Sequence, residues 1–259
     1  MQAVVVSLSD WRGIGDVRII GLDNYVAVLG DAETWSSLSL TFGYALVSSV
    51  GTVAVATLLA ASVSAGVPGS SFYRVIWFLP GIAPGAAVGI FWATAFQPDF
   101  GAVNVVGKLF GASGRSALLA ASQTAIIPIV LVTVWASVGF AFLLLLGGIE
   151  QIPPTIYEAA RVDGATGVRQ FFLITLPLTR PVIVTTTFLN FIWSFNGFTT
   201  VWSMTRGGPG NATLTFPVAV YKEAFQFADY GPASALALIG GVALLIVGFV
   251  GLRFSRSSQ

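Results

Sequence analysis

Five long stretches without a charged residue constrain this chain more than any other feature of its sequence. Between successive charged residues they run 34–73, 75–98, 116–149, 181–205 and 230–252. Each exceeds the roughly 20 residues that an α-helix needs to cross the hydrocarbon core of a bilayer. They do not alternate strictly between polar and apolar residues, so spanning strands are not expected. The sequence therefore predicts an all-α, polytopic membrane helix bundle with five complete spans, at about 38–64, 75–96, 123–147, 182–204 and 232–252.

Composition supports this prediction and excludes several classes of function. The chain is 55% hydrophobic and 9% charged, whereas soluble domains carry roughly 25% charged residues. Cysteine and histidine are both absent, which removes disulfides, thiol chemistry and the commonest zinc ligand. The net charge of +1 gives no reason to expect nucleic acid as a partner. Neither lysine, Lys108 or Lys222, belongs to a G-x-x-x-x-G-K-[ST] loop. No metal or cofactor is therefore expected in this chain, and any ATP and Mg²⁺ must be bound by a partner.

The longest polar insertion in the second half of the chain lies between the third and fourth predicted spans, at 158–181. The proline pair at 153–154 is expected to end the preceding helix. Thr155 and Glu158 have the T-x-x-E spacing of a capping box, which predicts the start of a short helix. The Asp-Gly pair at 163–164 predicts its end after two turns.

A second short helix is expected to follow, through Phe171 and Phe172, and to end before Pro177. Two short helices outside the bilayer, joined by a turn, are typical of an element that docks on a partner. The local chemistry does not name that partner.

The order of these residues resembles the EAA loop, which marks the permease subunits of binding-protein-dependent ABC importers. The residues that carry the resemblance are Glu158, Ala159, Ala160, Asp163, Gly164, Leu176 and Pro177. The resemblance implies that 149–181 is a cytoplasmic loop and that these residues couple it to a groove of the ATPase subunit. Two adjacent alanines give a flat face for close approach, and the glycine allows a sharp exit from the helix. The alternative is an ordinary amphipathic helix between two spans.

Other phrases resemble the same family, from about Ser7 to the end of the chain. They are SLSDW at 7–11, GLDNY at 21–25, RVIWFLP at 74–80, and the GGP, Y-x-x-AF and GPASA phrases within 207–235. They point to the larger permease subunit of maltose-type and glycerol-3-phosphate-type importers, and so imply the transmembrane fold of type I ABC importers. That family usually has six spans. Residues 1–35 are therefore expected to be the remnant of a first span plus an extracytoplasmic segment, and 36–259 the transmembrane permease domain.

If the loop at 149–181 is placed in the cytoplasm, the segments inside and outside the membrane hold equal numbers of lysine and arginine residues. The positive-inside rule therefore does not decide the orientation. The resemblance implies that 149–181 and the C-terminus face the cytoplasm. It implies that 97–120 and 205–230 face outside.

A polar stripe in the fourth predicted span is the candidate path for a solute. Asn190, Trp193, Ser194 and Gly197 fall at i, i+3, i+4 and i+7, which places them on one helix face. An amide, a hydroxyl and an indole at membrane depth suit a sugar, and the resemblance implies contact with sugar at these positions. Packing between helices explains the stripe equally well.

The third predicted span holds a second candidate set. Val138, Gly139 and Phe142 fall at positions that line the path in the family. Here helix packing is the favoured explanation.

The predicted spans contain no charged residue, which argues against ion-driven carriers and charged-ring channels. It also favours a neutral substrate. No constellation for acid–base or nucleophilic catalysis is visible at membrane depth, so we do not expect an enzyme. The sequence and the resemblance together lead to one hypothesis: a multi-pass permease half of an ATP-driven sugar importer in the inner membrane of a bacterial or archaeal cell.

The expected partners are a second homologous permease, an ATPase dimer, an extracytoplasmic solute-binding protein, the sugar and the lipid bilayer. Alternatives are an importer of glycerol-3-phosphate or another polar solute, an ion-coupled secondary carrier, or a scaffold subunit that does not transport.

Overall fold

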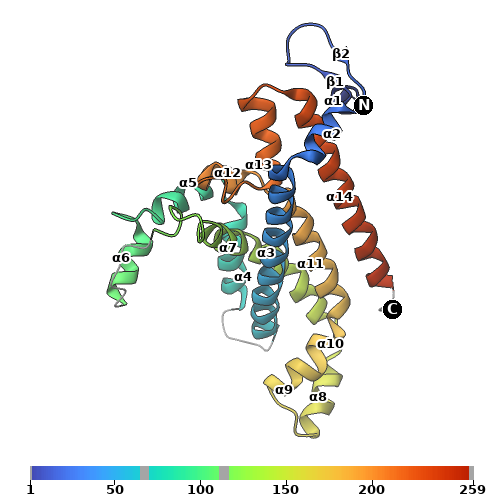
Figure 1. Ribbon diagram of the computed structural model, residues 1–259. Helices are drawn as coiled ribbons and strands as arrows, with labels where there is room; N and C mark the ends of the chain where they lie inside the picture. Colours follow the sequence, from blue (N-terminus) through green and yellow to red (C-terminus); the bar gives the residue numbers. More distant parts are fainter. Residues whose placement is uncertain (1, 65–69, 111–116, 257–259) are drawn as a thin grey trace. The chain divides into compact units, whose positions relative to one another are not determined.

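The computed structural model describes residues 2–64, 70–110 and 117–256, and most of these residues are helical (Figure 1). A small antiparallel hairpin pairs β1 (Ser9–Asp10) with β2 (Arg18–Ile19). The all-α prediction is therefore confirmed. The helices, in chain order, are α1 (Gln2–Ser7), α2 (Asp23–Gly30), α3 (Ala32–Ser64), α4 (Ser70–Ile82), α5 (Gly85–Ala95), α6 (Ala102–Leu109), α7 (Ile126–Glu150), α8 (Pro154–Val162), α9 (Val168–Gln170), α10 (Leu176–Leu178), α11 (Arg180–Phe195), α12 (Thr199–Thr205), α13 (Phe216–Tyr221) and α14 (Tyr230–Arg256), with π-helical turns η1 (Phe171–Thr175) and η2 (Lys222–Gln226).

Three helices of the described part of the chain are each long and apolar enough to cross a membrane. They are α3, α7 and the portion of α14 from Tyr230 to Phe249. Two interrupted helix pairs meet the same criterion when each pair is taken together, namely α4 with α5 and the segment 168–178 with α11. The number of spans among the described residues is therefore three, or up to five if each pair crosses as one.

Two of the five predicted spans are not continuous helices. Pro80 and Pro84 predict a kink in the second span, and the structure has a full break there; the interruption of the fourth was not expected. In the second, Pro80 remains inside α4, whereas Pro84 precedes α5 with extended backbone (ψ 125°) and separates the two helices. A proline ring disfavours the α conformation at the residue before it, and here the backbone leaves the helix at 83–84. The fourth predicted span, 182–204, ends as a helix at Phe195 and resumes as α12 at Thr199. Asn196 and Gly197 have low helix propensity, so an uncharged stretch did not guarantee a continuous helix.

The chain divides into two compact units, each built from several chain segments. The first holds residues 1–45, 84–130 and 195–250, and the second holds 46–83, 131–194 and 251–259.

In the first unit, the hairpin is fixed to the start of α14 and to α2. The Tyr230 amide donates to the Trp11 carbonyl oxygen (3.2 Å), and their rings lie 5.3 Å apart. Asn24 Nδ2 donates to the carbonyl oxygens of Ser7 and Ser9, at 2.9 Å each. This buried amide thus provides a partner for one backbone acceptor at the end of α1 and one in β1. A small apolar core of this unit joins Val28, Phe216, Ala235 and Leu236.

In the second unit, the core lies between the C-terminal half of α3 and α7. Its buried members are Val53, Ala56, Ala60, Val63, Val138, Ala141, Phe142, Leu145, Leu146 and Ile149. α4 packs closely on α7 because Gly139 has no side chain: a Cβ there would lie 2.7 Å from Phe78 Cα. Small residues permit such close helix contacts in membranes. Arg74 at the start of α4 forms an ion pair with Glu150 at the end of α7 (2.6 Å).

Candidate functional site

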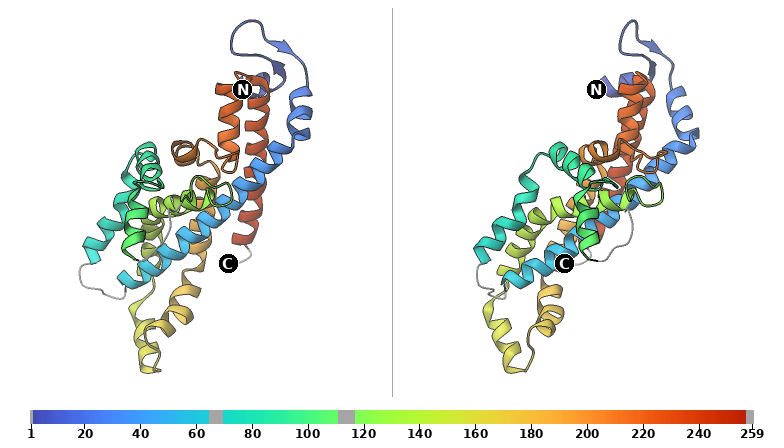
Figure 2. Two further views of the ribbon diagram at one scale, coloured as in Figure 1. Left: turned by 60° about the vertical axis from the view of Figure 1, so that its left-hand side comes forward. Right: turned by 90° about the vertical axis from the view of Figure 1, so that its left-hand side faces the viewer.

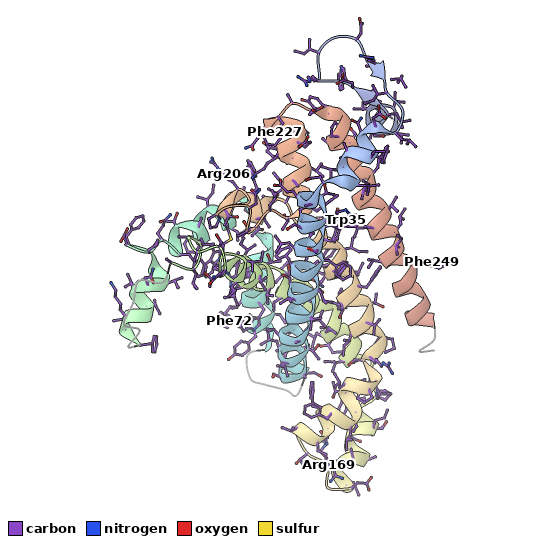
Figure 3. All side chains as sticks on the ribbon, viewed as in Figure 1. Trp35, Phe72, Arg169, Arg206, Phe227 and Phe249 are labelled. Carbon is purple, nitrogen blue, oxygen red and sulfur yellow. The ribbon has the colours of Figure 1, made fainter. Side chains whose placement is uncertain are left out.

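The segment from α8 to α10 projects from the second unit as a helical hairpin. It extends beyond the C-terminal ends of α3 and α7, and all three views agree on this (Figures 1 and 2). Arg169 lies on this projection (Figure 3). α8 has no buried residue, so nearly its whole surface is open to a partner.

α8 begins two residues earlier than a capping box at Thr155 would set it. Pro153 precedes the helix, Pro154 occupies its first turn, and no side chain caps the helix start. The predicted capping box of Thr155 and Glu158 is therefore wrong. Proline at the first helical position removes an N–H that has no partner within the helix anyway, and its fixed φ suits the helix. Proline therefore replaces the cap, and Thr155 lies inside α8.

The end of α8 is where the sequence predicts it. Asp163 follows the last helical residue, and Gly164 adopts a left-handed conformation with φ +79°. The Ala165 amide then donates to the Ala160 carbonyl oxygen at 2.8 Å. This is the 6→1 bond of a glycine-terminated helix end. A Cβ on Gly164 would meet nothing within 4 Å. Glycine is required there for its conformation and not for space.

The second helix of the projection is longer than predicted. Helical structure continues from Val168 through the π-helical turn η1 and through Pro177 to Leu178, so the expected end before Pro177 is wrong. Pro177 lies in the first turn of α10. The wider i→i+5 turn before it has already interrupted the regular ladder, so the missing proline N–H breaks no bond.

The predicted coupling residues lie at two places on this projection. Glu158, Ala159, Asp163 and Gly164 are exposed on α8 and its end, and Ala160 is half-buried. Leu176 and Pro177 lie at the other end of the second helix, near the start of α11. The fold thus presents the acidic, alanine and glycine positions together and holds the Leu-Pro pair apart from them.

A cavity of about 540 Å³ separates α8 from the ends of α3 and α7. Its walls include Ala61, Ile149, Glu150, Tyr157, Arg161 and Thr175. Side-chain hydrogen bonds hold the projection together on its inner side. Tyr157 Oη and Thr175 Oγ1 share one at 2.9 Å, and Gln170 Nε2 donates to the carbonyl oxygens of Ala165 (2.7 Å) and Tyr157 (3.4 Å).

The polar stripe predicted for the solute path is divided by the structure. Asn190 and Ser194 are buried in α11, and Asn190 Nδ2 donates to the Thr186 carbonyl oxygen (2.9 Å). Trp193 is 51% exposed, with its ring 4.9 Å from that of Phe140. Gly197 lies outside α11, in the break before α12, so the expected four-residue face is wrong at this position.

The second candidate set lies in the helix-packing core. Val138 and Phe142 are buried between α3 and α7, and Gly139 contacts the backbone of α4. In this arrangement the three residues contribute to packing between helices, which was the explanation that the sequence favoured. A role for either set in a solute path stays a prediction.

A row of aromatic rings in the first unit was not singled out from the sequence. Phe198, Trp202, Tyr221 and Phe225 contact one another, with centroid separations between neighbours of 4.6 to 5.6 Å. The spacing of four residues within each of the pairs 198/202 and 221/225 was the signal that could have shown it. The row connects the end of the fourth predicted span, where Phe198 and Trp202 lie, with α13 and η2 in the segment predicted to face outside.

Carboxylates gather near this row. Burial raises the pKa of the Glu223 carboxyl above its usual range, and the charges of Asp229, Asp31 and Glu33 raise it further. Glu33 also accepts a hydrogen bond from Asn211 Nδ2 at 2.8 Å. Among the described residues, no group of three or more acidic side chains is arranged to hold a metal ion.

Comparisons with known proteins agree with this architecture. The chain is 33% identical over 244 residues to a probable ABC transporter permease of Bacillus subtilis, YesP, covering 93% of this chain and 77% of the relative. It is 27% identical over 260 residues to the permease MsmF of the multiple sugar-binding transport system of Streptococcus mutans, covering 100% of this chain and 89% of the relative. In fold it resembles a chain of a bacterial ABC transporter that imports the acidic polysaccharide alginate, with a TM-score of 0.81, 23% identity and coverage of 92% of this chain and 84% of that one.

A family model described as the inner membrane component of binding-protein-dependent transport systems matches residues 52–257. The match covers most of the sequence, including α8 and the whole projection that bears it. This chain therefore belongs to the family of inner membrane components of binding-protein-dependent transport systems.

Proposed function

We propose that this chain is the permease half of an ATP-driven sugar importer and that it couples to its ATPase through α8. The observation that carries the proposal is α8 itself: a two-turn helix without a buried residue, ended by a left-handed glycine, on a projection beyond the membrane-spanning core. In its family, which consists of membrane components of transport systems, a helix so exposed is explained by a partner that covers it.

In this coupling role, each docking residue has a separate function. Ala159 and the neighbouring Ala160 leave room for a close approach of the partner, and Glu158 offers a charge to a basic group. Gly164 turns the chain away before it would obstruct the contact. ATP and its Mg²⁺ are bound by the partner ATPase dimer, because this chain carries no phosphate-binding loop.

The remaining partners follow from the family and from relatives. A second homologous permease completes the translocation path, and an extracytoplasmic solute-binding protein delivers the solute. One solved neighbour was determined with a periplasmic protein that carries an alginate pentasaccharide. A sugar is the proposed substrate because one relative is a multiple sugar-binding system permease, and because the exposed indole of Trp193 on α11 suits the apolar face of a sugar.

A docking experiment tests the coupling role. Ala159→Trp places a large ring on the exposed face of α8, where the partner must approach closely. We expect this variant to insert in the membrane at the native level but to lose its ATPase on purification. Ala102→Trp, at an exposed position of α6, makes the same change in a segment predicted to face outside and should keep the ATPase. Retention of the ATPase by Ala159→Trp would refute docking on α8.

A further inference from the structure

The connection between α8 and the membrane-spanning helices depends on few contacts. α8 buries no residue, and the cavity of about 540 Å³ lies between it and the ends of α3 and α7. The loop from α8 to α9 contains Gly164 and Gly167, both with positive φ (+79° and +45°), and it is held by the Ala165 amide and by the side chain of Gln170. These bonds join α8 to the start of the second helix of the projection and leave the constraint on its angle to α11 to other contacts.

A chain of hydroxyl groups crosses the inner side of the projection and supplies that constraint. The Tyr157 hydroxyl on α8 shares a hydrogen bond of 2.9 Å with the hydroxyl of Thr175. Thr175 is only 5% exposed. The Thr175 carbonyl oxygen accepts a bond of 2.6 Å from the hydroxyl of Thr179, which is buried as well. The backbone carbonyl oxygen of Thr179 in turn accepts a bond from the Ile183 amide, in the first turn of α11, at 2.9 Å.

This chain of hydroxyls lies at a bend. The helical segment 168–178 meets α11 at 70°, and Thr179 is the residue between them. A threonine hydroxyl that bonds back to a carbonyl four residues earlier favours bending of a helix. Thr175 thus bonds α8 through its side chain and bonds the residue at the bend through its carbonyl group.

We propose that Tyr157, Thr175 and Thr179 form a hydroxyl relay that holds α8 at a fixed angle to α11, so that movement of α8 is transmitted to that span. Tyr157 and Thr175 are positioning residues, because they act through α11 and not on the solute. α11 carries Asn190, Trp193 and Ser194, the candidate path residues, so the relay connects the docking surface to the proposed path. This inference rests on the proposed docking of an ATPase on α8.

The relay predicts a specific defect in Tyr157→Phe, which removes one hydroxyl and keeps the ring. The docking residues remain, so the variant should assemble with its ATPase and hydrolyse ATP. Movement of α8 during ATP hydrolysis would no longer be transmitted fully to α11, so the amount of solute transported per ATP hydrolysed should fall. The expected decrease is about fivefold, because the loss of one typical hydrogen bond shifts a two-state equilibrium by about that factor. The assay is uptake and phosphate release measured together in proteoliposomes of the whole complex.

Three companion variants separate the relay from a general loss of stability. Thr175→Val should give the same defect as Tyr157→Phe, and the double variant should be no worse, because both changes remove one shared bond. Thr175→Ser keeps the hydroxyl and should restore the native ratio. The matched control is Thr185→Val, on α11: its hydroxyl donates to the Pro181 carbonyl oxygen (2.9 Å) and has no bond to α8.

Spin labels give a readout that does not depend on transport. The chain has no cysteine, so single cysteines can be introduced at Val162 on α8 (88% exposed) and at the exposed Thr185 on α11, beyond the bend, without background from this chain. The native distance distribution should be narrow with and without ATP, and Tyr157→Phe should broaden it. A distribution as narrow as the native one, with a native solute-to-ATP ratio, would overturn the relay alone. A native complex that binds no ATPase and moves no solute would overturn the proposed function and the relay together.

Discussion

Gly164 offers the sharpest test of how the sequence ends the docking helix. Its φ of +79° lies in the left-handed region, where a residue with a Cβ costs about 1 kcal/mol more than glycine. A Cβ at this position meets no atom within 4 Å, so no steric clash adds to that cost. Gly164→Ala should therefore destabilise the helix end by about 1 kcal/mol, which corresponds to an increase of about fivefold in local opening.

The assay is hydrogen exchange of the Ala165 amide, which bonds to the Ala160 carbonyl oxygen across the turn. Gly164→Asn should exchange at an intermediate rate, because asparagine tolerates the left-handed region better than alanine. Gly147→Ala is the matched control: a Cβ there also meets nothing within 4 Å, but the glycine lies inside α7. It should stabilise the protein by roughly 0.5–1 kcal/mol. Equal exchange in glycine, asparagine and alanine variants would refute the conformational argument.

Three further predictions concern other parts of the chain. Gly139→Ala should lower the free energy of unfolding by roughly 1–3 kcal/mol, because its Cβ would press on the backbone of α4; a thermal transition in detergent at the native temperature would contradict this. The raised pKa of Glu223 means that the folded protein binds a proton more tightly than the unfolded chain, so stability should fall as pH rises above the ordinary glutamate pKa. Glu223→Gln should flatten that dependence and Asp16→Asn, at an exposed position, should not, as thermal transitions across pH 4–8 would show. The Arg74–Glu150 ion pair is 42% and 48% exposed, so a double-mutant cycle should give a coupling of less than about 1 kcal/mol that shrinks in high salt; a coupling of several kcal/mol would show that the pair is shielded from water by a partner.

The membrane class and the docking element could be predicted from the sequence because both depend on local chemistry. Long uncharged stretches have few alternatives to helices in a bilayer, and an Asp-Gly pair after two helical turns specifies a helix end almost alone. The family resemblance then added a partner that the residues by themselves did not name.

The continuity of the helices could not be predicted from apolar composition. Uncharged stretches indicate where a chain prefers lipid, but the break at 196–198 is set by local propensity, which composition does not report. The π-helical turn at Phe171–Thr175 had no sequence signal that we recognised, and it let the helix continue through Pro177. The contact between Tyr157 and Thr175 joins residues 18 positions apart and depends on how two helices cross, which requires the tertiary structure.

The ATPase activity of the complete complex in lipid distinguishes an ATP-driven importer from the alternatives. The complex would contain this chain, a second permease and the ATPase, and it would be assayed against a panel of solute-binding proteins, each with and without its sugar. We expect the ATPase to co-purify and one loaded binding protein to stimulate it, which would also identify the substrate. A complex without ATPase, or solute uptake that persists without ATPase and stops when an uncoupler is added, would contradict the proposal of an ATP-driven importer.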